Sequence, residues 1–265
     1  MRLPCAERVA GRLVVLPTCG STNAELRALA AVTSAPGPDA PAEPLPHLTV
    51  LVTDAQTAGR GRLDRQWTTP PGSALAISVL LRELPADPDL WGWLPLAAGA
   101  AMTDAVAAQL PGCEVGLKWP NDVLVDGRKI CGILAEVLPE GAVIVGSGVN
   151  TAMTAAELPV PTATSFAMLG VAVNADALLA EYLIGLRARI VALSRDGDAM
   201  ASGLHDAVAA RCLTLGRPVQ VSLPDGELLH GRAVRLETDG RLTIATDDGQ
   251  QRTVASGDVV HARLT

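Results

Sequence analysis

The sequence predicts an α+β protein, with a main domain of about 210 residues followed by a small β-barrel. Two observations support this fold class. Through residue 212, short strand-like runs alternate with longer segments of helical character. After Arg217 the chain is divided into short strands by turn sequences, which is the rhythm of a small antiparallel barrel. These turns are Pro224-Asp225-Gly226, Thr238-Asp239-Gly240 and Asp247-Asp248-Gly249.

The first helix is predicted by its start signal. Thr22 is followed three residues later by Glu25, which is the spacing of a capping box, and the helix is expected to run to about Ala31. Three further segments are predicted to be mainly helical: residues 90–110, entered near Pro95, residues 174–194 and residues 200–212.

Strands are predicted where apolar and β-branched residues gather in short runs. In the main domain these runs are residues 12–16, 48–53, 74–81, 115–119, 123–125, 130–137 and 143–149. Asp126-Gly127 joins two of the runs and predicts a hairpin. Loops are expected at the Pro- and Ala-rich residues 35–46 and at the Gly- and Arg-rich residues 54–67.

Composition excludes several classes of protein. The longest apolar stretch, residues 90–102, contains Pro95 and is too short to span a membrane. The first residues carry no secretion signal, so we expect a soluble, cytoplasmic protein. A net charge of −7 disfavours nucleic acid and anionic membranes as partners. Five widely spaced cysteines predict reduced thiols and no zinc site.

Lysine is rare in this chain. Among 21 lysines and arginines, only Lys118 and Lys129 are lysines. Lysine carries a compact charge on a flexible stem, whereas arginine is a planar donor fork, so a site that needs the first geometry rejects the second. The two lysines therefore suggest one functional site, and chance retention is the alternative interpretation.

The loop at residues 56–67 has the residue types of an anion site. Gly59 and Gly61 let backbone amides approach an anion, and Arg60, Arg62 and Arg65 add charge-assisted hydrogen bonds. The loop matches neither the P-loop nor the dinucleotide-binding pattern. A flexible basic surface turn is the alternative interpretation.

A stiff corner follows at Lys118-Trp119-Pro120-Asn121-Asp122. Pro120 fixes its own φ and restricts the preceding residue, so Lys118 and Asp122 are held in set directions. Because the next hairpin folds back, we expect Lys118 and Lys129 to face one cavity. A plain turn with solvated lysines is the alternative.

Five motifs, in this order and spacing, resemble those of biotin protein ligases. They are Ser21-Thr22-Asn23, Gly59-Arg60-Gly61-Arg62, Lys118-Trp119-Pro120-Asn121-Asp122, Lys129 with Gly132-Ile133-Leu134, and Gly146-Ser147-Gly148-Val149-Asn150. The resemblance covers about residues 15–265. It implies a mixed-sheet catalytic domain of the biotin/lipoate ligase type at residues 1–213 and an SH3-like β-barrel at residues 214–265.

The family activity implied is ATP-dependent ligation. Biotin reacts with ATP, in the presence of Mg²⁺, to give biotinyl-5′-AMP and pyrophosphate, and the biotinyl group then passes to a lysine of a biotin carboxyl carrier domain of a carboxylase. Bifunctional members carry a DNA-binding domain before the catalytic domain. Only about 20 residues precede Ser21, so the resemblance is to the monofunctional type, and no oligomeric state is predicted.

The resemblance also implies the roles of individual residues. Catalytic residues would be Lys129, Lys118, Arg62 and Asp122. Biotin would contact Ser21, Thr22, Asn23, Gln56, Gly59, Arg60, Gly61, Arg62, Lys129 and Gly132. ATP would contact Arg62, Arg65, Trp67, Lys118, Asn121 and Asn150.

Two features of these assignments stay open. Asp122 would position magnesium or the attacking amine, or it is a turn-capping residue. The loop also departs from the family at Leu63 and Asp64, where other members have a small or polar residue and a glycine, which indicates a stiffer and less basic loop.

Two other functions are compatible with these patterns. A lipoate or octanoyl transferase would use a cysteine nucleophile, and Cys131 lies two residues from Lys129, on the same face of a strand. In its apolar surroundings, however, Cys131 is more readily interpreted as a buried, inert thiol. A biotin-sensing regulatory module is the second alternative, and the acidic charge disfavours it.

Overall fold

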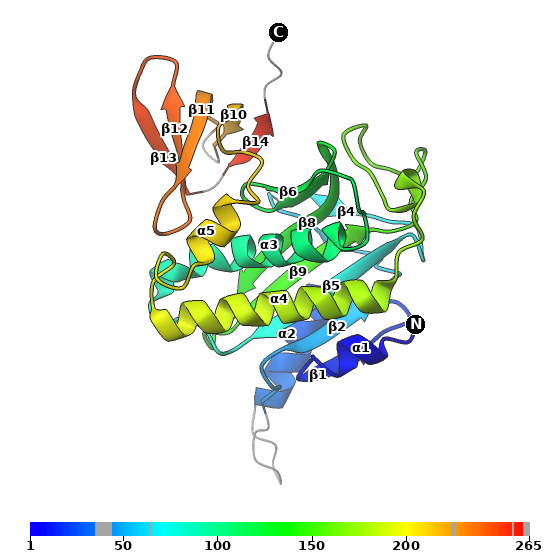
Figure 1. Cartoon of the computed structure of the whole chain (residues 1–265). Coiled ribbons are helices and arrows are strands. Elements are labelled where there is room, and N and C mark those ends of the chain that lie inside the picture. Colours follow the sequence, from blue (N-terminus) through cyan, green and yellow to red (C-terminus); the bar gives the residue numbers. More distant parts are fainter. Residues whose placement is uncertain (35–43, 64, 224–225, 256, 262–265) are drawn as a thin grey trace.

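A seven-stranded mixed sheet lies at the centre of the main domain (Figure 1). The computed structural model describes residues 1–34, 44–63, 65–223, 226–255 and 257–261. In spatial order the strands are β1 (Arg12–Val15), β2 (Thr49–Thr53), β5 (Ala74–Leu81), β9 (Val143–Asn150), β8 (Arg128–Val137), β7 (Asp122–Val125) and β6 (Val115–Lys118). The β1–β2 pair is parallel and the other neighbouring pairs are antiparallel.

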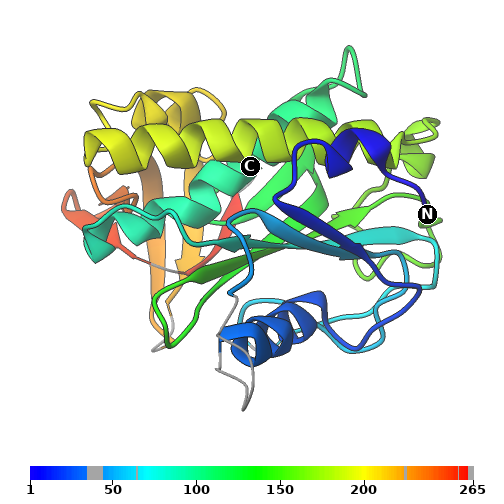
Figure 2. The same cartoon turned by 90° about the horizontal axis from the view of Figure 1, so that it is seen from below.

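Helices cover both faces of this sheet (Figure 2). On one face, α3 (Trp93–Ala107) packs against the strands, and α4 (Ala175–Asp196) packs on α3. The short α1 (Pro4–Glu7) lies against α4. On the other face, α2 (Thr22–Ser34) contacts β2, β5 and β9. Two apolar cores result, one on each side of the sheet.

The strand β2 shows how sequence alternation builds these two cores. Val50 and Val52 belong to the core under α3, whereas Leu51 belongs to the core under α2. Because neighbouring side chains of a strand point to opposite faces, the run is apolar throughout. The apolar centre of β2, Val50-Leu51-Val52, thus follows from a sheet that is covered on both faces.

The C-terminal region forms a second, five-stranded antiparallel sheet (Figure 1). Its strands are β10 (Pro218–Ser222), β11 (Leu228–Leu236), β12 (Leu242–Thr246), β13 (Gln251–Val254) and β14 (Asp258–His261), in the spatial order β13-β12-β11-β10-β14. The main domain holds this sheet at the β11–β12 turn. The indole N–H of Trp93 donates to the carbonyl of Thr238 at 2.8 Å, and that of Trp119 donates to Gly240 at 3.0 Å.

The predicted α+β fold class is confirmed, and two local predictions are wrong. Residues 200–212 are not one helix, because α5 spans only Leu204–Ala209 and begins after Gly203, whose φ is +72°. Ahead of it, the Asp198 carboxylate accepts from the Ala201 amide in a turn. Thr22 does not cap α2, because Ser21 precedes the helix and its Oγ lies 3.5 Å from the Ala24 amide.

Short elements complete the described chain. The predicted loop at residues 54–67 contains a small hairpin of β3 (Gly59–Arg60) and β4 (Gln66–Trp67). Single 3₁₀ turns, η1 (Pro88–Gly92) and η2 (Ala167–Leu169), precede α3 and α4. Most of the predicted loop 35–46, Asp64 and the first two residues of the predicted turn 224–226 lie outside the described residues. In the described residues no helix is long and apolar enough to cross a membrane.

Candidate functional site

A cavity of about 490 Å³ opens beside β7, β8 and β9. Its wall is completed by the start of α2, by Gly257 and Asp258 of the C-terminal region, and by the Gly- and Arg-rich residues 54–67, called the Gly/Arg loop below. Most of the site residues predicted from the sequence line it. They are Ser21, Thr22, Asn23, Gln56, Arg60, Gly61, Arg62, Arg65, Trp67, Asn121, Asp122, Lys129, Gly132 and Asn150. Gly59 and Lys118 are not in this lining.

One end of the cavity is formed by Gln56 and the first turn of α2. The side-chain oxygen of Gln56, Oε1, accepts from the backbone amide of Thr22 at 2.8 Å and from the Thr22 hydroxyl at 3.1 Å. Both residues are buried. Gly59 packs behind this pair, since a Cβ there would lie 2.2 Å from the Gln56 amide nitrogen. Gly59 thus shapes the wall but does not line the cavity, whereas the family resemblance implied a contact between Gly59 and biotin.

Asn23 is held by a network of polar groups. Its amide donates to Glu136 Oε2 at 2.6 Å, and its carbonyl oxygen accepts from Ser78 Oγ at 2.6 Å. Arg27 pairs with the other Glu136 oxygen at 2.6 Å. The structure therefore places Asn23 in the wall, with its amide group already engaged by protein partners.

Glu136 and Arg27 were not predicted from the sequence, although both line the cavity. A signal existed, because Glu136 interrupts the apolar alternation of residues 130–137 and Arg27 lies one helical turn after Asn23. Buried or half-buried charges need partners, so two such residues of opposite charge on different elements indicate an ion pair.

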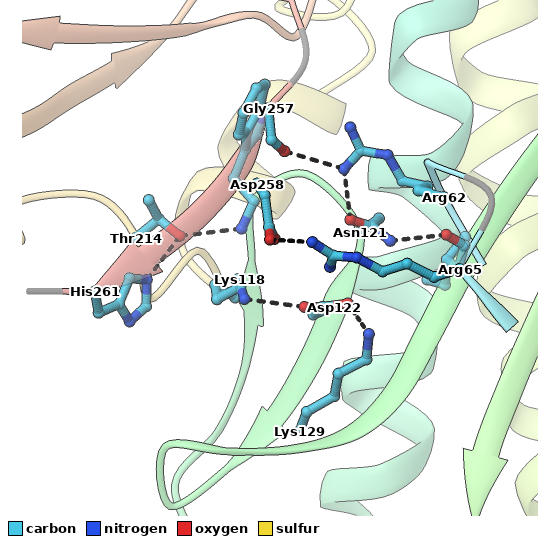
Figure 3. Close-up of polar contacts among 12 residues, drawn as sticks. Arg62, Arg65, Lys118, Asn121, Asp122, Lys129, Thr214, Gly257, Asp258 and His261 are labelled. Carbon is cyan, nitrogen blue, oxygen red and sulfur yellow. Dashed lines mark hydrogen bonds and ion pairs between the residues drawn. The ribbon is translucent and has the colours of Figure 1, made fainter. Parts of the chain in front are cut away.

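A second region of the site centres on Asp122 (Figure 3). This carboxylate begins β7 and is shared by two ammonium groups, with Lys129 Nζ 2.5 Å from Oδ1 and Lys118 Nζ 3.0 Å from Oδ2. The strand register brings Lys118 directly opposite Asp122. Lys129 reaches back across Gly132, where a Cβ would lie 3.0 Å from the Lys129 Nζ. Asp122 is thus a charged partner of both lysines and not a turn cap.

The electrostatics of this group favour an ionised carboxylate. Burial acts to raise the pKa of Asp122, but Lys129 and Lys118 act in the other direction and the net pKa is below its usual value. The prediction that both lysines face one cavity is half confirmed. Lys129 lines the cavity, whereas Lys118 does not line it and instead forms an ion pair with Asp122, which does.

The Gly/Arg loop joins the cavity to the C-terminal sheet (Figure 3). Arg62 donates to the Asn121 side-chain oxygen at 2.8 Å and to the Gly257 carbonyl at 3.3 Å. Arg65 pairs with Asp258 at 2.5 Å, in a contact that is largely exposed. Asp258 and Gly257 were missed by sequence reasoning, because nothing local marks a contact across more than 190 residues.

Two more predicted residues lie in the wall between the loop and β9. Trp67 lies flat against Gly148, where a Cβ would be 2.7 Å from the indole. Asn150 is buried and its amide donates to the Thr164 carbonyl at 2.9 Å. In the loop itself, Leu63 has φ of +54°, in the left-handed region where a glycine is free of strain.

The described residues hold no ready-made cluster of metal ligands. Among them no group of three or more His, Cys, Asp or Glu side chains is placed to hold a metal ion. Both oxygens of Asp122 are already paired with lysines, and Asp258 is paired with Arg65. The described carboxylates therefore form no magnesium cage of their own, whereas an ion held mainly by ATP phosphates needs only one or two protein carboxylates.

Comparison with known proteins places the chain among relatives of one kind. Residues 38–150 match the family described as "Biotin/lipoate A/B protein ligase family", and residues 214–262 match "Biotin protein ligase C terminal domain". The chain is 39% identical to the biotin–[acetyl-CoA-carboxylase] ligase of Mycobacterium tuberculosis over 95% of its own length and 90% of that protein. The chain belongs to the biotin protein ligase family.

A solved structure and a more distant relative agree with this membership. The fold superposes on the Aquifex aeolicus biotin protein ligase in complex with biotin and ATP with a TM-score of 0.74, at 26% identity, over 96% of this chain and 99% of that one. The bifunctional ligase/repressor of Escherichia coli is 28% identical over 89% of this chain and 70% of its own length.

Proposed function

We propose that the chain is an ATP-dependent biotin protein ligase that works in two steps within this cavity. A carboxylate oxygen of biotin attacks the α-phosphorus of ATP, the bond to the β-phosphate breaks, and pyrophosphate leaves. The neutral amine of an acceptor lysine then attacks the acyl carbon of biotinyl-5′-AMP, loses a proton, and releases AMP. The observation that carries this proposal is a cavity with a polar region at Gln56 and Thr22 and a cationic region at Arg62 and Lys129.

The polar end suits the ureido ring of biotin. The two ring N–H groups and the ureido carbonyl oxygen need hydrogen-bond partners when buried, because an unpaired polar group loses its hydration without replacement. Ser21, Thr22 and Gln56 supply such groups in the cavity wall. Asn23 contributes by holding the wall in shape, since its amide is engaged by Glu136 and Ser78.

The cationic region suits the first step. Both reactants are anions, so fixed positive charge is needed to bring them together and to stabilise charge that grows on the phosphoryl oxygens. Lys129, Arg60 and Arg62 line this part of the cavity. We assign Lys129 to the meeting point of the biotin carboxylate and the α-phosphate, and Arg65, Trp67, Asn121 and Asn150 to the nucleotide.

Asp122 suits the second step better than it suits magnesium. The resemblance implies that this residue positions magnesium or the attacking amine, and both of its oxygens already lie against lysine ammonium groups, which favours an amine as the partner. We assign Asp122 to the acceptor amine, which replaces a lysine ammonium at the carboxylate as it enters. Magnesium then reaches the site with the ATP phosphates and not through a protein carboxylate.

The acceptor and the domain division complete the proposal. The acceptor is the biotin carboxyl carrier domain of a carboxylase, supported by the name of the M. tuberculosis relative. Residues 1–213 form the catalytic domain and residues 214–265 an SH3-like β-barrel domain, supported by the second family match at 214–262. Gly257 and Asp258 bring the barrel to the rim of the cavity.

The experiment that tests the function is direct. The full chain is incubated with biotin, MgATP and a biotin carboxyl carrier domain, and the acceptor is analysed by mass spectrometry for a biotinyl group on one lysine. Omitting ATP must abolish the modification, and pyrophosphate must accumulate with it. ADP and phosphate as products, or no modified acceptor, would contradict the proposal.

A transferase that forms a thioester on Cys131 is disfavoured by the structure. Burial raises the pKa of this thiol to about 12, despite the nearby Lys129. A nucleophilic cysteine needs a lowered pKa and an accessible sulfur. We expect Cys131→Ala to keep biotin transfer, and a loss of activity in that variant would reopen the thioester route.

A further inference from the structure

Lys118 and Lys129 differ in where their ammonium groups lie. Lys129 lines the cavity and 42% of its side chain is exposed, whereas Lys118 is 20% exposed and is not part of the cavity wall. The two groups bind different oxygens of Asp122 (Figure 3). A ligand in the cavity can therefore touch Lys129 directly but is separated from Lys118 by the carboxylate.

The charge balance of this group depends on Lys118. Asp122 is nearly buried, so water contributes little to neutralising it, and its direct ion pairs are with the two lysines. Two ammonium groups and one carboxylate leave a net charge of +1, while Lys129 and Asp122 alone would leave zero. Because Coulomb interactions are strong where water is excluded, this difference sets how much positive charge an anion in the cavity meets.

We infer that Lys118 is a positioning residue for the adenylation step: it neutralises Asp122, and the charge of Lys129 is thereby left for the reacting anions. The inference rests on the proposed ligase function. It differs from the role implied by the family resemblance, in which Lys118 binds the ATP phosphates itself. The geometry separates the two roles, because Lys118 contacts Asp122 and not the cavity.

The test is a charge-restoring pair of substitutions. Lys118→Met removes the neutralising charge, and Lys118→Met/Asp122→Asn also removes the carboxylate, so the second variant regains the net charge of +1 at Lys129. The readout is the single-turnover rate of pyrophosphate release from biotin and MgATP without acceptor, which leaves out any role of Asp122 in the second step. Arg187→Met on the exposed face of α4 controls for loss of a surface cation.

We expect Lys118→Met to slow pyrophosphate release on the order of 10²-fold, as for loss of one group that stabilises developing charge. The double variant should recover to within about tenfold of the wild type, with an ATP affinity close to normal. If the double variant stays as slow as Lys118→Met, or both bind ATP much more weakly, Lys118 acts on the phosphates or on the fold and the inference is overturned.

Folding is checked in the same experiment by thermal unfolding. Lys118→Met leaves a buried carboxylate with one partner, which is a destabilising change. If that variant does not fold, the double variant decides alone, because it leaves no buried charge unpaired: near-normal pyrophosphate release supports the inference and a folded, inactive protein overturns it. If the wild type itself releases no pyrophosphate from biotin and ATP, the proposed function fails, independently of Lys118.

Discussion

Gly132 explains why a lysine stands at position 129. The Lys129 side chain passes so close to Gly132 of the same strand that a Cβ on Gly132 would lie 3.1 Å from Lys129 Cε and 3.0 Å from Nζ. A slim methylene chain fits this crossing, whereas the planar guanidinium of an arginine is wider and longer. The retention of a lysine in an arginine-rich chain thus has a steric reason at this position.

The first prediction is that Lys129→Arg folds normally but loses most adenylation, although the charge is unchanged. A displaced cation no longer stabilises the charge that develops at the α-phosphate, which typically costs about 10² to 10³ in rate. The measurement is pyrophosphate release at saturating biotin and ATP. Arg187→Lys, on an exposed helix face, is the matched control and should be nearly silent. Near-normal release by Lys129→Arg would mean that the site is wrongly assigned.

Gly146 supports the second prediction, which concerns Asn23 in the cavity wall. A Cβ at this residue of β9 would lie 2.4 Å from Asn23 Oδ1, so Gly146→Ala must push Asn23 away from Glu136 and Ser78. We expect biotin to bind on the order of tenfold more weakly, since one or two hydrogen bonds are lost. Calorimetric titration with biotin measures this. Gly20→Ala, whose Cβ meets open space, is the control, and equal affinities in both variants would contradict the role of Asn23.

At the scale of elements, the Gly/Arg loop is held to the rest of the protein by contacts of its arginines. Its arginines reach Asn121, the Gly257 carbonyl and Asp258, and the Arg65–Asp258 pair is exposed. Exposed ion pairs contribute little to stability. An anionic ligand offers the same arginines charge-assisted hydrogen bonds in a drier environment, and these are stronger.

The third prediction is therefore that the loop becomes ordered over biotinyl-5′-AMP. Amide exchange at Gly59–Gly61 and Arg65–Trp67 should slow when biotin and MgATP are added, because the loop closes on the adenylate. The amides of β5, in the middle of the sheet, serve as the internal control and should not change. Equal exchange with and without ligand would contradict loop closure.

Element by element, local signals predicted what local chemistry determines. Asp126 and Gly127 both have positive φ, +47° and +75°, as the hairpin signal at these residues required. Asn174 caps α4 and Gly197 ends it in the left-handed conformation. The failed helix at residues 200–212 shows the limit, because its apolar residues satisfied a helical pattern while Gly203 and the Asp198 turn favoured other backbone conformations.

At the scale of the whole molecule, the contacts between the main domain and the C-terminal sheet could not be predicted from the sequence. The site residues Arg62 and Arg65 were predicted to bind a ligand, but not to touch Gly257 and Asp258. Contacts between segments this far apart are set by tertiary packing, which leaves no periodicity or motif in the chain. Roles for individual residues at the site stay predictions, whereas the family and the fold class are confirmed.

One of these contacts makes stability depend on pH. His261, on β14, contacts the Thr214 hydroxyl at 3.1 Å, and that hydroxyl accepts from the Trp119 amide of the main domain. Burial, followed by the charges of Lys118 and Arg217, lowers the pKa of His261 from 6.5 to about 4. Between these values the unfolded chain binds a proton that the folded protein does not. This histidine therefore leaves the free energy of unfolding unchanged above pH 6.5 and lowers it as the pH falls from 6.5 toward 4.

The fourth prediction is that His261→Gln makes stability less sensitive to acid. Because this side chain is only about half buried, we expect the wild type to lose about 1 kcal/mol more unfolding free energy than the variant between about pH 7 and about pH 5. Urea unfolding at the two pH values measures the difference, and glutamine keeps a hydrogen-bond partner for Thr214. The exposed His230, replaced by glutamine, is the control and should follow the wild type. Parallel curves for the wild type and His261→Gln would show that His261 does not couple the C-terminal sheet to pH.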